Sequence, residues 1–187
     1  MNSLKLLLAT LFLCTSFATA NAQYLIEPAE GYSPNIGTLV DMMENLKERI
    51  TMQVKDLDQE QTDFLFDEKA NCISALIMHL VATEAYYQVE TLESRSWTKK
   101  EEKQWGPASS LSPKVNQQLQ GKPISYYLEL WDEVRAKSLT GLKTKDDAWL
   151  ASNPTGDMNN YFAWFHVIEH MANHMGQIAL VKNRLPK

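Results

Sequence analysis

Hydrophobic side chains recur at steps of three and four residues in four separate stretches of this chain. Such a recurrence places apolar residues on one face of an α-helix, and no stretch shows the convincing alternation of a half-buried strand. The four stretches span residues 34–55, 71–93, 125–142 and 158–182. The clearest stripe, in the first stretch, consists of Ile36, Leu39, Val40, Met43, Leu46, Ile50 and Val54. The pattern predicts an all-α protein built as a four-helix bundle.

Two long irregular stretches separate the last three predicted helices. Residues 94–123 are polar and contain several Gly and Pro, and residues 143–157 form a second connection. A connection as long as the first is uncommon inside a compact domain, so we expect a long crossover that contains a short helix at 113–119. Ser33 precedes a proline and Asn71 opens the second stretch, and both residue types commonly cap the start of a helix.

The N-terminal residues have the features of a secretory signal peptide. Lys5 supplies a basic start, residues 6–13 form an apolar run, and residues 20–22 are Ala-Asn-Ala, the small-x-small pattern of a cleavage site. The apolar run is well short of the roughly 20 residues that a membrane-spanning helix needs. We therefore predict a signal peptide at residues 1–22 and one domain at residues 23–187. The protein is expected to be exported, periplasmic or extracellular, and free of the membrane after cleavage.

The charge balance argues against a nucleic-acid partner. The chain has 18 Lys and Arg against 23 Asp and Glu, for a net charge of −5. Neutralising a phosphate backbone requires an excess of basic residues instead. Removal of the signal peptide also removes Cys14 and leaves Cys72 as the only thiol. An exported domain without an internal disulfide has to be stabilised by its core or by a metal.

All four histidines of the chain, His79, His166, His170 and His174, fall in the predicted helices. His170 and His174 are separated by about 40° around the helix and about 6 Å along it, so both imidazoles can face one ion. His79 lies on the apolar face of residues 71–93 and can supply a third nitrogen from across the bundle. Buried imidazoles are costly when protonated, and a divalent cation satisfies them in the neutral form. The spacing alone also permits ordinary packed or solvent-facing histidines.

Three histidine ligands would leave a fourth coordination position for water or a substrate atom, as in catalytic zinc sites. The candidate ligands of such a divalent ion are His79, His170 and His174, with zinc or nickel as the expected metal. His166 stays near the same face as His170, so it is expected to orient a ligand or to pack. The sequence contains no His-Glu-x-x-His motif and identifies no general base, so peptidase activity gains no support.

Several other residues lie near these positions in the helical pattern. Thr83 and Gln177 are placed to hydrogen-bond the predicted ligands or to fill the bundle. Cys72 is about 10 Å along the helix from His79, so we expect a small buried residue and not a ligand. Glu84 is rotated by about 140° from His79, which favours a salt bridge or a surface role. The tryptophans of the connections either line a pocket mouth or pack in the core.

Two segments resemble a known protein family. Residues 165–178, FHVIEHMANHMGQI, resemble the last-helix signature of the DinB/YfiT-like superfamily, in which two histidines four apart are followed by Gly-Gln-Ile. Residues 75–84 resemble the second helix of that family, and the likeness extends from about residue 33 to residue 186. The resemblance implies a four-helix bundle with up-down-down-up connectivity. It also implies a divalent metal held by the three predicted histidine ligands.

Proteins of this superfamily include thiol-dependent S-transferases and isomerases as well as metal-dependent hydrolases. The resemblance therefore implies a metal-dependent enzyme that acts on a small-molecule substrate, either hydrolase-like or thiol S-transferase-like, and it favours a homodimer. The signal peptide weighs against S-transfer, because low-molecular-weight thiols are expected chiefly in reducing compartments. The alternative is a non-catalytic metal-binding or sensing bundle, which a closed fourth coordination position would favour.

Overall fold

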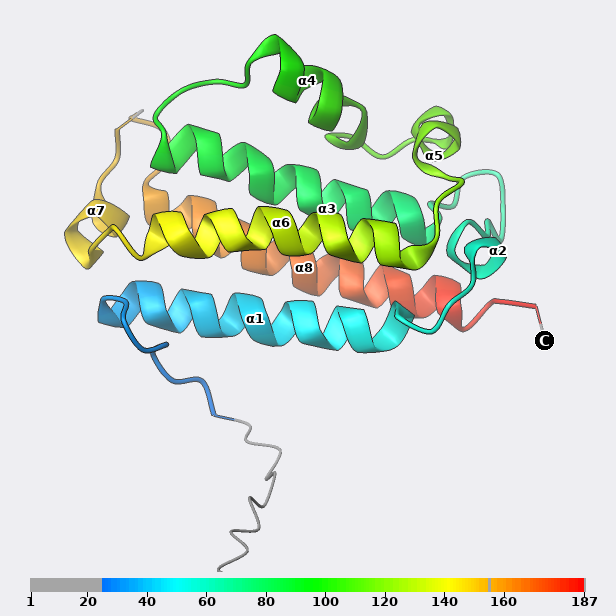
Figure 1. Ribbon diagram of the computed structural model, residues 1–187, viewed down its shortest axis with the longest axis horizontal. Helices are drawn as coiled ribbons and strands as arrows, with labels where there is room; N and C mark the ends of the chain where they lie inside the picture. Colours follow the sequence, from blue (N-terminus) through cyan, green and yellow to red (C-terminus); the bar gives the residue numbers. More distant parts are fainter. Residues whose placement is uncertain (1–24, 155, 187) are drawn as a thin grey trace, which may run out of the picture.

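The computed structural model (Figure 1) describes residues 25–154 and 156–186. The predicted signal peptide at residues 1–22 lies outside these described residues. Within them the chain forms eight α-helices, one π-helical segment and one 3-10 segment, without any strand. The prediction of an all-α fold is therefore confirmed. A search of the described helices finds none with the length and apolar character needed to span a bilayer.

Four long helices form the bundle: α1 (Pro34–Val54), α3 (Ile73–Tyr87), α6 (Ile124–Leu142) and α8 (Asn160–Lys182). α3 packs against α6 and α8, and α1 packs against α8. The colours in Figure 1 show that α1 and α8 run in one direction, whereas α3 and α6 run in the opposite direction. This is the up-down-down-up arrangement that the family resemblance implies. It brings α3 and α8 side by side and antiparallel.

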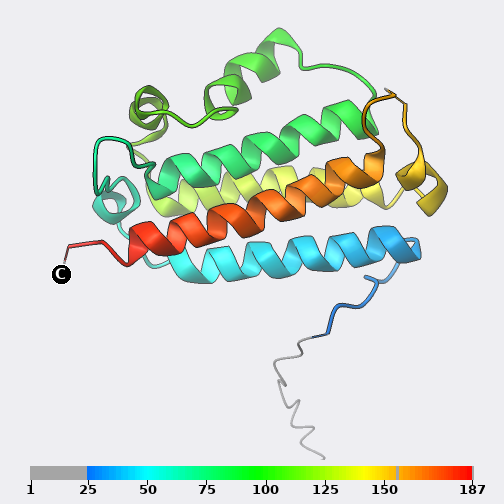
Figure 2. The same cartoon turned by 180° about the vertical axis from the view of Figure 1, so that it is seen from behind.

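The connection from α3 to α6 extends from one end of the bundle to the other, because these neighbouring helices run in the same direction. It contains α4 (Lys99–Trp105), the 3-10 segment Gly106–Ala108 and α5 (Pro113–Leu119). Figure 2 shows from behind that this crossover lies along α3. The predicted short helix is confirmed as α5. α4 was not predicted, because its sequence of Lys, Glu and Gln residues carries no apolar stripe.

The start of α1 is capped from a distant part of the chain. Ser33 holds the N-cap position, but its side chain does not cap the helix and its hydroxyl donates to Asp147 instead. Asp147 opens the short helix α7 (Asp147–Ala151), and its carboxylate accepts the backbone N–H groups of Asn35 and Ile36. The capping role predicted for the Ser33 side chain is therefore wrong, and the charge of Asp147 takes that role.

α3 departs from its predicted bounds at both ends. Cys72, and not Asn71, holds the N-cap position, and its side chain makes no capping hydrogen bond. At the other end the α-helix gives way to a π-helical segment at Gln88–Leu92. Apolar spacing over a single turn does not distinguish these two helix types, so the sequence predicts one continuous helix there. The one-turn helix α2 (Gln59–Thr62) lies in the connection from α1 to α3.

The core lies between the four long helices and uses the apolar stripes that the sequence predicts. All seven residues of the α1 stripe are buried. Trp131 on α6 and Trp164 on α8 are fully buried in the same core. Because aromatic side chains of this size bury a large apolar area, they contribute strongly to the stability of the bundle.

A charged network crosses the centre of this otherwise apolar core. Glu84 on α3 is 1% exposed and accepts hydrogen bonds from Arg135, Trp131 and Ser138, all on α6. Arg135 is 3% exposed and also donates to Glu44 on α1, at 2.7 Å. Burial raises the pKa of Glu84, but the charge and hydrogen bonds of Arg135 outweigh burial and hold that pKa below its usual value. The salt bridge expected for Glu84 is confirmed, whereas a surface role for it is wrong.

Candidate metal centre

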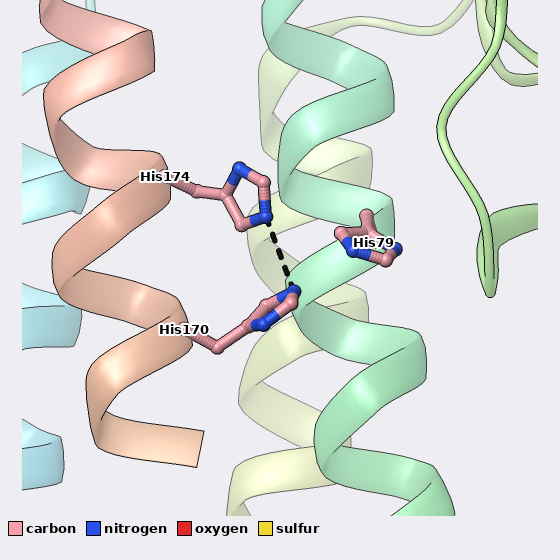
Figure 3. Close-up of side chains that lie close together, drawn as sticks. All are labelled: His79, His170 and His174. Carbon is pink, nitrogen blue, oxygen red and sulfur yellow. Dashed lines mark hydrogen bonds between the residues drawn. The ribbon is translucent and has the colours of Figure 1, made fainter. Parts of the chain in front are cut away.

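Three histidines converge where α3 packs against α8 (Figure 3). His170 and His174 project from successive turns of α8, and His79 faces them from α3. One ring nitrogen of each residue lies within 4.8 Å of those of the other two. The Nε2 atoms of His170 and His174 are 3.1 Å apart. The structure therefore brings together the three residues that the sequence predicts as a ligand set.

The hydrogen-bond partners of two rings leave Nε2 available as an acceptor. His79 Nδ1 lies 2.7 Å from the carbonyl oxygen of Ala108, and His174 Nδ1 lies 3.1 Å from Gln177 Oε1. Both partners are acceptors, so each Nδ1 donates its hydrogen and each Nε2 carries a lone pair. This arrangement is typical of metal-binding histidines, whose other ring nitrogen is held by a carbonyl or carboxylate.

Burial also favours the neutral form of the three imidazole rings, which is the form that binds a metal cation. It lowers the pKa values of His79 and His174 below their usual range. The pKa of His170 is lowered to about 3, first by burial and then by the neighbouring histidines. Neutral imidazoles are the form that binds a divalent metal. The close contact of two ring nitrogens is one that a shared cation stabilises, so the donor set fits a divalent metal ion.

The two residues expected to support the ligands behave differently. Gln177 contacts the His174 ring, as described above, and its own amide donates to Asn173. The hydroxyl of Thr83 instead donates to the backbone carbonyl of His79, at 2.8 Å, and does not contact the ring. Cys72 is fully buried at the start of α3, where its sulfur contacts the Ser74 hydroxyl. It does not belong to the histidine cluster.

A cavity of about 410 Å³ opens beside His79 and His170. Tyr86, Tyr87 and Trp97 supply aromatic surface to its lining. Of these, Trp97 comes from the crossover and lines the cavity, whereas Trp105 of the same crossover is buried in the core, so both of the expected roles occur. A cavity beside a ligand set provides a route and a volume for a small molecule.

His166 lies next to the histidine cluster but outside it. Its ring is 5.2 Å from that of His170, between centroids, and it also lines the cavity. His166 Nδ1 is 2.9 Å from the hydroxyl of Tyr87. The sequence does not identify Tyr87 as a functional residue, because one tyrosine on an apolar helix face is indistinguishable from a packing residue. The Ala108 carbonyl was missed as well, since backbone groups have no sequence signature.

The bundle topology and the histidine cluster between α3 and α8 place this chain among the DinB/YfiT-like proteins. Its sequence matches the model of the family described as mycothiol-S-transferase over residues 38–186. The chain belongs to that family. The matched region contains all of α3, α6 and α8.

The fold is also similar to a solved structure, the crystal structure of a conserved protein from Enterococcus faecalis. The two chains share 12% sequence identity, with a TM-score of 0.62 and coverage of 78% of this chain and 93% of that chain. At this identity the likeness supports the fold alone. A comparison with curated proteins returned no match.

Proposed function

We propose that this protein is a metal-dependent thiol S-transferase, which joins the sulfur of a low-molecular-weight thiol such as mycothiol to a small electrophile. The observation that carries this proposal is the family match over residues 38–186, because the matched region includes His79, His170 and His174. The cavity beside two of these histidines supports it, since both reactants need space near the ion.

In this proposal the three histidines hold a divalent ion, zinc or nickel. When bound, the ion would act as a Lewis acid and lower the pKa of a thiol or a water molecule that reaches it. The Ala108 carbonyl and Gln177 orient two of the rings, and burial keeps the imidazoles neutral. The thiol proton passes to solvent, and the sulfur forms a bond to the electrophilic carbon. The bond between that carbon and the displaced group breaks, and its electron pair leaves with the displaced group.

Hydrolysis is the second candidate function. It is favoured by the signal peptide predicted at residues 1–22, because an exported enzyme would meet little of the low-molecular-weight thiol that S-transfer consumes. A sensing or purely structural metal site would need no substrate space beside the ligands. The cavity at His79 and His170 therefore favours either enzymatic reaction over that alternative.

Cobalt(II) in place of the native ion is expected to separate these functions. Azide and 2-mercaptoethanol should each change the visible absorption of the cobalt protein, because three histidines leave a coordination position that exchanges with solvent. The thiol should also add a sulfur-to-cobalt charge-transfer band. A response to azide without that band would support hydrolysis and contradict S-transfer. No response to either ligand, with one cobalt bound, would contradict both enzymatic proposals.

We also propose that the protein is exported and cleaved after Ala22. The basic start, the apolar run and the small residues before Gln23 support this proposal. Mass spectrometry of protein recovered from outside the cytoplasm is expected to find an N-terminus at or next to Gln23. A full-length chain that begins at Met1 in the soluble cytoplasm would contradict it.

A further inference from the structure

Tyr87 and His166 form a hydrogen bond in the wall of the cavity. His166 lies on α8, one turn before His170. The Tyr87 side chain comes from the last turn of α3, and the tyrosine is 8% exposed. The His166 ring also stacks on Phe162, with 6.1 Å between centroids. Packing and the hydrogen bond together fix the orientation of the imidazole.

The direction of this hydrogen bond follows from the hydrogen-bond partners of the Tyr87 hydroxyl. The Tyr87 hydroxyl has no other hydrogen-bond partner among the described residues. Burial raises its pKa, with smaller contributions from Tyr86 and Glu90, so the hydroxyl keeps its proton at neutral pH. A hydroxyl hydrogen without an acceptor is costly, and His166 Nδ1 is the acceptor that the described residues place within reach. The tyrosine therefore donates, and Nδ1 carries the lone pair.

His166 is thereby set up in the opposite way to His79 and His174. Those two rings donate from Nδ1 to carbonyl oxygens and present a lone pair at Nε2. His166 accepts at Nδ1, so as a neutral ring it carries its hydrogen on Nε2. That nitrogen has no hydrogen-bond partner in the described part of the chain, and the residue lines the cavity.

We propose that Tyr87 is a positioning residue that holds His166 in its Nε2–H form. In this form His166 Nε2–H donates a hydrogen bond to an acceptor atom of the electrophilic substrate. The identity of that ligand as a substrate rests on the proposed function, whereas the state of the His166 ring does not.

The cavity lining indicates the chemical class of this substrate. Its aromatic side chains suit an apolar carbon skeleton, and the His166 donor suits one acceptor, such as a carbonyl oxygen. Its only carboxylate among the described lining residues is Glu102, and no Lys or Arg lines it there. Apart from an ion held by the histidines, an anionic molecule would find no cationic group among the described lining residues. The geometry therefore favours an uncharged electrophile with a carbonyl-type acceptor.

The ring state can be measured directly by NMR on the zinc-loaded protein with 15N-labelled histidine. Long-range proton–nitrogen spectra should show a protonated Nε2 and an unprotonated Nδ1 for His166, assigned with a His166→Gln variant. Tyr87→Phe should convert His166 to a mixture of tautomers, and the matched control Tyr86→Phe should leave it unchanged. A wild-type ring with hydrogen on Nδ1, or an equal mixture, would overturn the proposal.

The donor role can be measured with two neutral probes of similar shape, acetophenone and ethylbenzene. The ketone should bind about fivefold more tightly, the ratio expected from one neutral hydrogen bond. His166→Phe should remove this preference, and His166→Gln, which keeps a donor, should retain part of it. Equal binding of both probes by the wild type would overturn the substrate contact. Neither measurement needs a thiol or turnover, so a missing thiol band on cobalt would refute S-transfer and leave the Nε2–H assignment intact.

Discussion

Alanine in place of His170 or His174 is expected to abolish stoichiometric metal binding. The wild type should retain about one divalent ion per chain, because three neutral imidazoles converge on one point. Removing an outer hydrogen-bond partner of a ligand typically costs about 10- to 100-fold in affinity, and removing the ligand itself should cost more. Metal analysis after dialysis measures the effect. Thermal unfolding should also lose its response to added zinc, since only the folded wild type offers the full ligand set.

His166→Ala is the matched control for these variants. It removes a histidine from the same helix, one turn before His170, but leaves the three predicted ligands in place. Its metal content should equal that of the wild type. Unchanged metal content in His170→Ala and in His174→Ala would rule out this site. A loss that is as large in His166→Ala would mean that a different set of histidines binds the ion.

Arg135→Met is expected to destabilise the fold by about 3–5 kcal/mol, the usual cost of leaving a buried charge without its partner. The Glu84 carboxylate would keep the hydrogen bonds from Trp131 and Ser138 but lose the one cation that contacts it among the described residues. Urea denaturation at pH 7 measures the change in the free energy of unfolding. Asp132→Asn, which breaks the surface ion pair with Lys47, should cost about 1 kcal/mol or less.

The pH dependence of this destabilisation has a definite sign. In the wild type the pKa of Glu84 is lower when folded than when unfolded, so the pair stabilises the fold above the unfolded pKa and loses this effect as pH falls. In Arg135→Met the cation is absent, so burial raises the pKa of Glu84 in the folded state. The variant therefore gains stability relative to the wild type as pH falls. The difference in the free energy of unfolding between the wild type and Arg135→Met should therefore become smaller from pH 7 to pH 5. A difference independent of pH would contradict an uncompensated Glu84 charge.

The long helices and the histidine cluster could be predicted because both depend on helical periodicity. A stripe of apolar residues identifies the face of α1 that packs, and a spacing of four residues puts His170 and His174 on one side of α8. Placing His79 opposite them required the four-helix bundle as well, which the apolar stripes predict and the family resemblance supports. The spacing within α8, together with the assumption that α3 packs against α8, was sufficient to predict the histidine cluster.

The remaining features depend on contacts between distant parts of the chain, which periodicity does not contain. Asp147 caps α1 from more than a hundred residues away. Arg135 compensates a carboxylate on another helix, so Glu84 is fully buried where rotation about the axis allowed a surface position. Tyr87 and the carbonyl of Ala108 gain their significance only from the side chains that face them.

The three predicted ligands lie on α3 and α8, at points roughly 90 residues apart along the chain. An ion bound there would tie the first half of the bundle to its last helix, as a covalent cross-link does in many exported proteins, while Cys72 stays a free buried thiol. Unlike a disulfide, such a tie is reversible without electron transfer. The lifetime of the folded protein would then follow the metal supply of its surroundings and not their redox potential.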